Sequence, residues 1–280
     1  MKETDFFQKL HEEFVISSQI DPPLITNFED LVLFDEEIAE IAEAGVEVID
    51  INSRSKLSLD SLCLAERYVG AEGFGLEVVP HVRVRGEDQL SLAKQILTAY
   101  TLAGITDYLL VTGDPLINAV EAQGVFPSAI EGIKLVDENL RRSNLDLHIT
   151  LGAAINQNAK DINVEEKKTR EKINAGTDFF MSQPVFNKEQ VIQTDRFYKS
   201  ATDGKPPLMM GLWAVTSHGI EEKIRSGKID GVVMPEEVED PVELVKFIKE
   251  EKMAQGIYLV APLRKPGQLV NFIDNLKDVL

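Results

Sequence analysis

The stretch LLVTGDP at residues 109–115 is an apolar run that ends abruptly on a glycine, a carboxylate and a proline. Branched apolar residues in such a short run, bounded by Gly and Pro, are typical of a buried parallel strand. The carboxylate of Asp114 would then lie at the carboxyl end of that strand, which is the edge where α/β proteins bind their ligands. Similar runs followed by polar residues recur along the chain. The stretch is therefore one unit of a repeating architecture.

Eight segments have this strand-like character, and amphipathic stretches with helical periodicity lie between most of them. The predicted strands are residues 14–20, 46–52, 76–82, 107–112, 146–153, 177–183, 207–213 and 256–261. Eight strand–helix units in a chain of this length are the signature of a (β/α)₈ barrel. A doubly wound open sheet is the alternative, but no Gly-x-Gly-x-x-Gly follows the first strand. We predict an α/β protein in which residues 1–280 form a single (β/α)₈ TIM barrel, without a separate regulatory domain.

Composition excludes several classes of protein. The chain has 280 residues, of which 44% are hydrophobic, and a formal net charge of -18. This charge would repel nucleic acids and anionic membranes, so we expect neither as a partner. The single cysteine, Cys63, excludes an internal disulfide, and we expect it to pack in the core. No segment resembles a signal peptide or a membrane span, which predicts a cytoplasmic protein.

Polar side chains follow most of the predicted strands, and closure of a barrel would bring these strand ends to one face. The resulting ring contains Gln19, Asn52, His81, Asp114, Asn156, Gln183 and His218. It has no His-x-His or HExxH spacing, so we predict no catalytic metal. Amide-rich rings suit a heteroaromatic ligand such as a flavin or a pterin, because Asn and Gln match its alternating donors and acceptors.

Three of these residues also have a purely structural explanation. Gly113 and Asp114 could form a simple turn in which the carboxylate caps the next helix. His81 follows a proline and could be a satisfied core histidine. Gln183 ends an apolar strand and could make a structural hydrogen bond.

Short motifs in a fixed order give the sequence a resemblance to a known family. These are QIDPP (19–23), EVVPHV (77–82), LVTGDP (110–115), GVF (124–126), GAAIN (152–156), KINAG (172–176), SQPVF (182–186), GVVMP (231–235) and GIY (256–258) with Pro262. Together they resemble the methylenetetrahydrofolate reductase family, especially its shorter bacterial branch and the reductase half of bifunctional homocysteine methyltransferase–reductase proteins. The resemblance implies a flavin-containing (β/α)₈ barrel that reduces the methylene bridge of a folate to a methyl group.

The resemblance also implies roles for individual residues. Gln19 and Asp114 would be the catalytic positions, and Gln183, His218 and Gln19 would bind the tetrahydrofolate derivative. The residues around FAD would be Asn52, His81, Gly113, Asp114, Phe126, Asn156 and Lys172, with Lys172 directed at the phosphates. Electrons would come from NAD(P)H or from a partner electron-transfer subunit, and we expect a homo-oligomer.

One position departs from the family pattern. The family carries a glutamate where this chain has Gln19, and that glutamate supplies the proton that opens the five-membered folate ring. A carboxamide cannot supply this proton, and general-acid catalysis is worth roughly 10²–10⁴ in rate. Either the glutamine is an engineered change, or the proton comes from Asp21, Asp114 or water, or the reaction differs. The last case leaves two alternatives: a folate-binding methyltransferase or demethylase component without flavin, and a subunit of a larger reductase complex.

Overall fold

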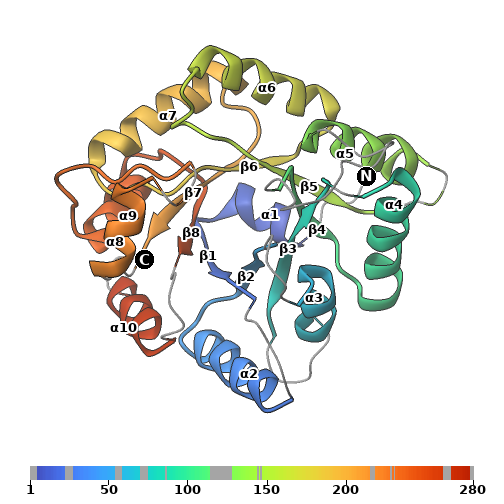
Figure 1. The fold of residues 1–280 in the computed structure, drawn as a ribbon, viewed down its shortest axis with the longest axis horizontal. Coiled ribbons are helices and arrows are strands. Elements are labelled where there is room, and N and C mark those ends of the chain that lie inside the picture. Colours follow the sequence, from blue (N-terminus) through green and yellow to red (C-terminus); the bar gives the residue numbers. More distant parts are fainter. Residues whose placement is uncertain are drawn as a thin grey trace.

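Eight parallel strands form a closed barrel in chain order, so that β8 pairs with β1 (Figure 1). The computed structural model describes residues 5–22, 28–53, 59–69, 75–85, 87–113, 128–143, 145, 147–214, 218–227, 229, 231–260 and 266–277. Helices surround the barrel on all sides. The predicted (β/α)₈ fold is confirmed, and the open sheet is excluded.

The strands lie where the apolar runs predicted them. They are β1 (Val15–Ile20), β2 (Val48–Ile51), β3 (Glu77–Arg83), β4 (Asp107–Val111), β5 (Thr150–Ala154), β6 (Phe179–Met181), β7 (Leu208–Trp213) and β8 (Gly256–Val260). The fifth strand begins later than predicted. The described helical elements are α1 (Asp5–Glu12), α2 (Phe28–Glu43), α3 (Ser61–Val69), α4 (Gln89–Thr98), η1 (Ala99–Ala103), α5 (Ala129–Val136), η2 (Asp137–Arg141), α6 (Ile162–Ala175), α7 (Lys188–Thr202), α8 (His218–Arg225), α9 (Pro241–Glu250) and α10 (Pro266–Leu276).

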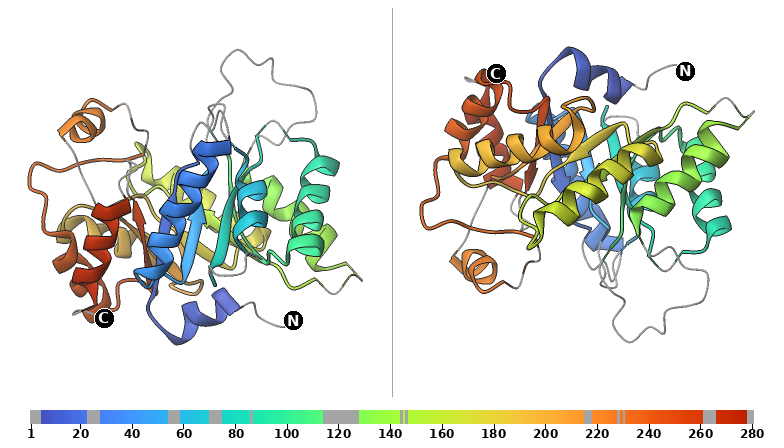
Figure 2. Two further views of the ribbon diagram at one scale, coloured as in Figure 1. Left: turned by 90° about the horizontal axis from the view of Figure 1, so that it is seen from below. Right: turned by 90° about the horizontal axis from the view of Figure 1, so that it is seen from above.

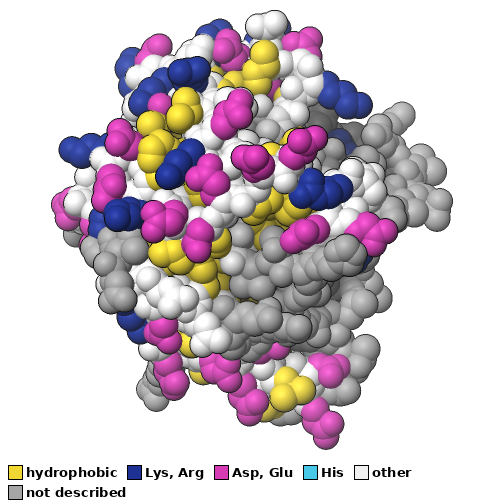
Figure 3. Space-filling view, turned by 90° about the vertical axis from the view of Figure 1, so that its left-hand side faces the viewer, with side chains coloured by type: hydrophobic (Ala, Val, Ile, Leu, Met, Phe, Trp, Pro, Cys, Tyr) yellow, Lys and Arg dark blue, Asp and Glu magenta, His cyan; other side chains and the backbone are white. Residues whose placement is uncertain are grey.

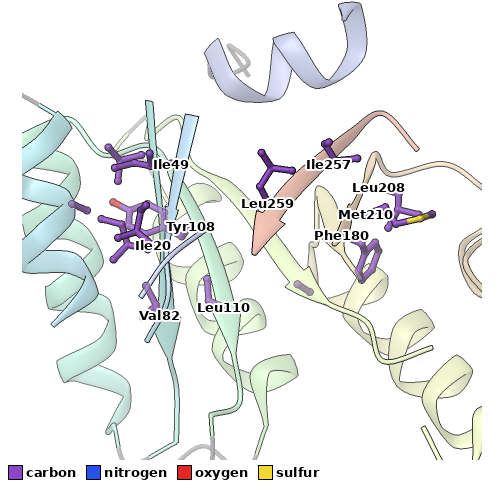
Figure 4. Packing of buried hydrophobic residues seen from close by; sticks show 14 of the residues in the cluster. Ile20, Ile49, Val82, Tyr108, Leu110, Phe180, Leu208, Met210, Ile257 and Leu259 are labelled. Atoms are coloured by element: carbon purple, nitrogen blue, oxygen red, sulfur yellow. The ribbon is translucent and has the colours of Figure 1, made fainter. Parts of the chain in front are cut away.

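The hydrophobic core has two shells because successive strand residues point to opposite faces. The outer shell packs the strands against the helices, and Ile49, Tyr108 and Leu110 belong to it (Figure 4). The inner shell fills the barrel and includes Val79, Leu109 and other side chains from alternate strand positions. A barrel filled in this way is a packed core and not a pore.

Helix α1 closes the amino end of the barrel. It lies across that end, whereas α8 lies near the opposite end (Figure 2). Phe6 is 1% exposed, and its ring packs edge-on against Phe179 with the centroids 5.2 Å apart. Beside it, Lys9 Nζ lies 2.8 Å from Glu47 Oε2 and 2.8 Å from Glu77 Oε1. The amino end is thus sealed by apolar packing and by ion pairs.

Cys63 corrects one expectation from the sequence. It lies on the exposed side of α3 and does not pack in the core. Partial burial, together with Asp60 and Glu66, raises the pKa of its thiol, which is the opposite of what activates a cysteine nucleophile. Leu62, Leu64 and Ala65 fill the buried face of this helix instead.

Candidate functional site

The carboxyl end of the barrel brings together most of the predicted polar residues that the structure describes. Gln19 lies in β1, His81 in β3, and Asn52, Asn156 and Gln183 directly follow or lie just beyond β2, β5 and β6. They reach one face because each strand runs in the same direction around the barrel. Asp114 and Phe126 lie outside the described residues, as does the side chain of His218 at the start of α8.

Two carboxamides at this mouth are not bonded to the described part of the chain. The side chains of Gln19 and Gln183 are half-buried and form no hydrogen bond with any residue in the described ranges. Trp213 Nε1 is buried and also lacks a partner there, while its ring stacks on Phe186 with the centroids 6.0 Å apart. Asn52 differs, because its Nδ2 donates to Asp21 Oδ1 over 2.9 Å. These three side chains lie on β1, on β7 and just beyond β6.

The backbone around Gln183 is held by Gln157. Gln157 Nε2 donates to the Gln183 carbonyl over 2.7 Å, and the Gln183 N–H donates to Gln157 Oε1 over 2.9 Å. This reciprocal pair fixes the Gln183 backbone and leaves its carboxamide to point elsewhere. Gly231 lies over that carboxamide, because a Cβ built at Gly231 would be 3.1 Å from Gln183 Oε1. Asn158 Nδ2 anchors the same segment by donating to the Gly231 carbonyl over 2.9 Å.

Lys172 supports the β5 loop in this structure. Its Nζ donates to the Ala154 carbonyl over 2.7 Å and lies 3.5 Å from Glu165 Oε1. Glu165 in turn accepts from the Asn156 N–H over 3.2 Å. Burial lowers the pKa of Lys172, and the nearby Glu165 offsets this only in part. Its predicted contact with cofactor phosphates would have to compete with these bonds.

Arg83 is a cation at the same mouth that is not engaged in this way. It ends β3 on the strand face that carries His81, and it forms no ion pair or hydrogen bond with a residue in the described part of the chain. The stem of Arg83 passes directly over Gly113, where φ is +78° and a Cβ would come within 2.1 Å of Arg83 Cδ. A side chain at position 113 would therefore collide with Arg83, and glycine allows the arginine side chain to lie where it does.

A buried polar cluster lies beneath the mouth, inside the barrel. Asp50 Oδ2 accepts from Ser17 Oγ over 2.8 Å, and Asp50 Oδ1 lies 3.1 Å from His81 Nε2. Ser17 and Asp50 are each 1% exposed, and His81 is 6% exposed. His81 is among the residues predicted from the sequence, whereas Asp50 is not. The signal for it was present, because a charged residue that interrupts the apolar run VIDI needs a buried partner.

Comparison with known protein families identifies the family of this chain. The family model described as "Methylenetetrahydrofolate reductase" matches residues 6–264. The chain belongs to this family. The match covers every described residue of the mouth and extends from α1 to beyond β8. No curated protein sequence matches this chain.

Solved structures share the fold of this family member at low sequence identity. A chain described as an uncharacterized protein from Clostridium thermocellum that binds two copies of 5-methyl-5,6,7,8-tetrahydrofolic acid has a TM-score of 0.71 and 18% identity, covering 99% of this chain and 100% of that one. A 2,3-dimethylmalate lyase of the PEP mutase/isocitrate lyase superfamily has a TM-score of 0.60 and 11% identity, covering 99% of this chain and 86% of that one. At these identities the likeness establishes the barrel fold.

Proposed function

We propose that this protein reduces 5,10-methylenetetrahydrofolate to 5-methyltetrahydrofolate with the help of a flavin, FAD. The proposal rests on family membership, and the observation that carries it is the pair of unpartnered carboxamides, Gln19 and Gln183, at the carboxyl mouth. A pterin or flavin ring presents alternating donors and acceptors that such carboxamides match. The Clostridium thermocellum protein with this fold, described as binding 5-methyl-5,6,7,8-tetrahydrofolic acid, adds support.

The residues of the mouth fit a flavin cofactor as well as a folate. When bound, the flavin would accept a hydride from NAD(P)H and pass it to the methylene carbon of the folate. Trp213 Nε1 and the two carboxamides would orient the ring systems. Arg83 would bind an anionic group, either a cofactor phosphate or a folate carboxylate, because its guanidinium is unpaired within the described residues. Asp114 would lie beside the reacting ring.

The absorption spectrum of the purified protein with added FAD tests this function. We expect flavin peaks that are bleached by NADH and restored by 5,10-methylenetetrahydrofolate. Replacing Asp114 by Asn should slow the restoring step. A flavin that binds but is never restored by the folate would contradict the proposal.

A second function is favoured by Gln19, which cannot act as an acid. It is a folate-binding methyltransferase or demethylase component without flavin. The same spectrum distinguishes the two, because this alternative predicts a colourless protein that still binds 5-methyltetrahydrofolate. A third outcome, bound flavin that NADH cannot bleach, would indicate a subunit that receives electrons from a partner protein.

A further inference from the structure

The buried cluster of Ser17, Asp50 and His81 lies next to Gln19, the position at which the family carries a glutamate. Gln19 and Asp50 are register partners across β1 and β2, and Asp50 and Val79 are register partners across β2 and β3. His81 is two residues beyond Val79, and the Asp50 carboxylate reaches it. Asp50 therefore lies between Gln19 and His81, joined to both neighbouring strands.

Barrel geometry then places Gln19 and His81 at the same depth. The side chains that fill a TIM barrel form layers contributed by alternate strands. Gln19 and His81 come from the first and third strands, whereas Asp50 comes from the second and lies one layer deeper, toward the amino end. A ligand in the mouth that contacts Gln19 would also reach the imidazole of His81. Asp50, at 1% exposed, would remain behind it.

The orientation of the imidazole suits proton donation. Its Nε2 faces Asp50 Oδ1 at 3.1 Å, off the line of an ideal hydrogen bond, and neither atom has another partner in the described structure. Nδ1 lies on the other side of the ring, and no described residue forms a hydrogen bond with it. An Asp that holds one imidazole nitrogen while the other meets the substrate is an arrangement that enzymes use for acid–base catalysis.

We propose that His81, oriented by Asp50, donates the proton that opens the five-membered ring of 5,10-methylenetetrahydrofolate, in place of the missing glutamate at position 19. This inference rests on the proposed reductase function. The imidazolium proton passes to N10 of the folate, and the bond between N10 and the methylene carbon breaks with its electron pair left on N10. The methylene carbon receives a hydride, with its two electrons, that originates from NAD(P)H and is carried by the flavin. His81 then regains a proton from water. Asp50 acts as a positioning residue.

Exchanging the two candidate acid positions tests the proposal. In the variant His81→Gln, we expect the reoxidation of reduced flavin by methylenetetrahydrofolate to slow about 10²-fold or more. Adding Gln19→Glu to this variant should restore at least a tenth of the lost rate, because it returns an acid to the same layer. The matched control is His11→Gln on the exposed surface of α1, which should leave the rate unchanged.

The outcomes separate the proton role from damage to the fold. If Gln19→Glu fails to restore His81→Gln, or if His81→Gln reacts at the full rate, the proton role of His81 is wrong. If the wild-type protein itself never reoxidises flavin with this folate, the reductase function fails and the inference falls with it. The wild-type experiment therefore distinguishes the two failures.

Asp50 is tested by its coupling to His81. Asp50→Asn should slow the folate step about tenfold or more in the wild-type background and less than about threefold in His81→Gln, because the two side chains act as one unit. A readout that needs no flavin is the ring N–H resonance of His81, which can be assigned because the chain has 4 histidines. We expect this resonance to shift in Asp50→Asn. Additive effects of the two substitutions, or an unshifted resonance, would overturn the role of Asp50.

Discussion

The two ends of the barrel differ in how their polar groups are satisfied. At the amino end, α1 buries Phe6 against Phe179, and Lys9 is paired with both Glu47 and Glu77. At the carboxyl end, the carboxamides of Gln19 and Gln183 have no hydrogen-bond partner in the described residues. Buried polar groups in proteins are usually satisfied, whereas these two amides are half-buried and open to hydrogen bonds with water or with a ligand. One end stabilises the fold, and the other is the end at which we propose that the ligands bind.

The outer surface shows no such division on the face drawn in Figure 3. Acidic and basic side chains of the described residues are interspersed there, over a surface with scattered hydrophobic groups. The difference in polar pairing described above therefore runs along the barrel axis and is not seen across this face.

The largest effect is expected from a substitution at the amino end of the barrel. Phe6→Ala removes a fully buried ring and should lower the free energy of unfolding by about 3–5 kcal/mol, measured by urea denaturation. The folate affinity of the protein that remains folded should not change. Phe7→Ala, on the less buried side of the same helix, is the matched control and should cost much less. A loss of affinity in folded Phe6→Ala would break the distinction between the two ends.

A substitution at the carboxyl end should show the reverse pattern. Gln183→Ala should weaken binding of 5-methyltetrahydrofolate by about tenfold or less, because one hydrogen bond is lost. Its free energy of unfolding should stay within about 0.5 kcal/mol of wild type, since the backbone at this position is held by Gln157. Calorimetric titration measures the first quantity. Gln193→Ala, exposed on α7, should change neither.

The smallest expected effect concerns the ion pairs of Lys9. Burial by itself lowers the pKa of Lys9, but hydrogen bonds to Glu47 and Glu77 outweigh it and hold the pKa above its ordinary value. Because the folded-state pKa is raised, these pairs stabilise the protein fully below the unfolded lysine pKa of about 10.4, and this contribution is lost as the pH rises through the folded-state pKa.

Lys9→Met measures that contribution. The difference in unfolding free energy from wild type should be about 1 kcal/mol or less and constant from about pH 7 to pH 9, since the pairs are partly exposed. It should shrink above about pH 10.4. A difference that grows at alkaline pH would contradict the assignment.

Local pattern was sufficient to predict the barrel and the end of the barrel at which most of the predicted polar residues lie. The run at 109–113 became the end of β4 and its glycine turn. Gln19, His81 and Gln183 were identified because each is a polar residue at the end of an apolar strand. Alternation with a period of two determines which face a side chain occupies, and this needs no knowledge of the partner strand.

The environment of helical side chains could not be predicted in the same way. Cys63 was expected in the core of α3, but the packing of that helix turned it to solvent. Lys172 was expected at cofactor phosphates, yet its ammonium group binds the Ala154 carbonyl and lies beside Glu165. Both outcomes depend on how a helix is rotated against the barrel, and helical periodicity near the edge of an apolar face does not decide that.

What the sequence by itself determined is therefore the (β/α)₈ architecture, the family and the polar strand ends that form the mouth. The tertiary structure alone decided that Asp50 meets His81, that Gln157 holds Gln183, and that Arg83 lies over Gly113. The physical reason is that strand periodicity sets only the direction of each side chain, whereas register and tilt, imposed by closure of the barrel, determine which side chains share a layer.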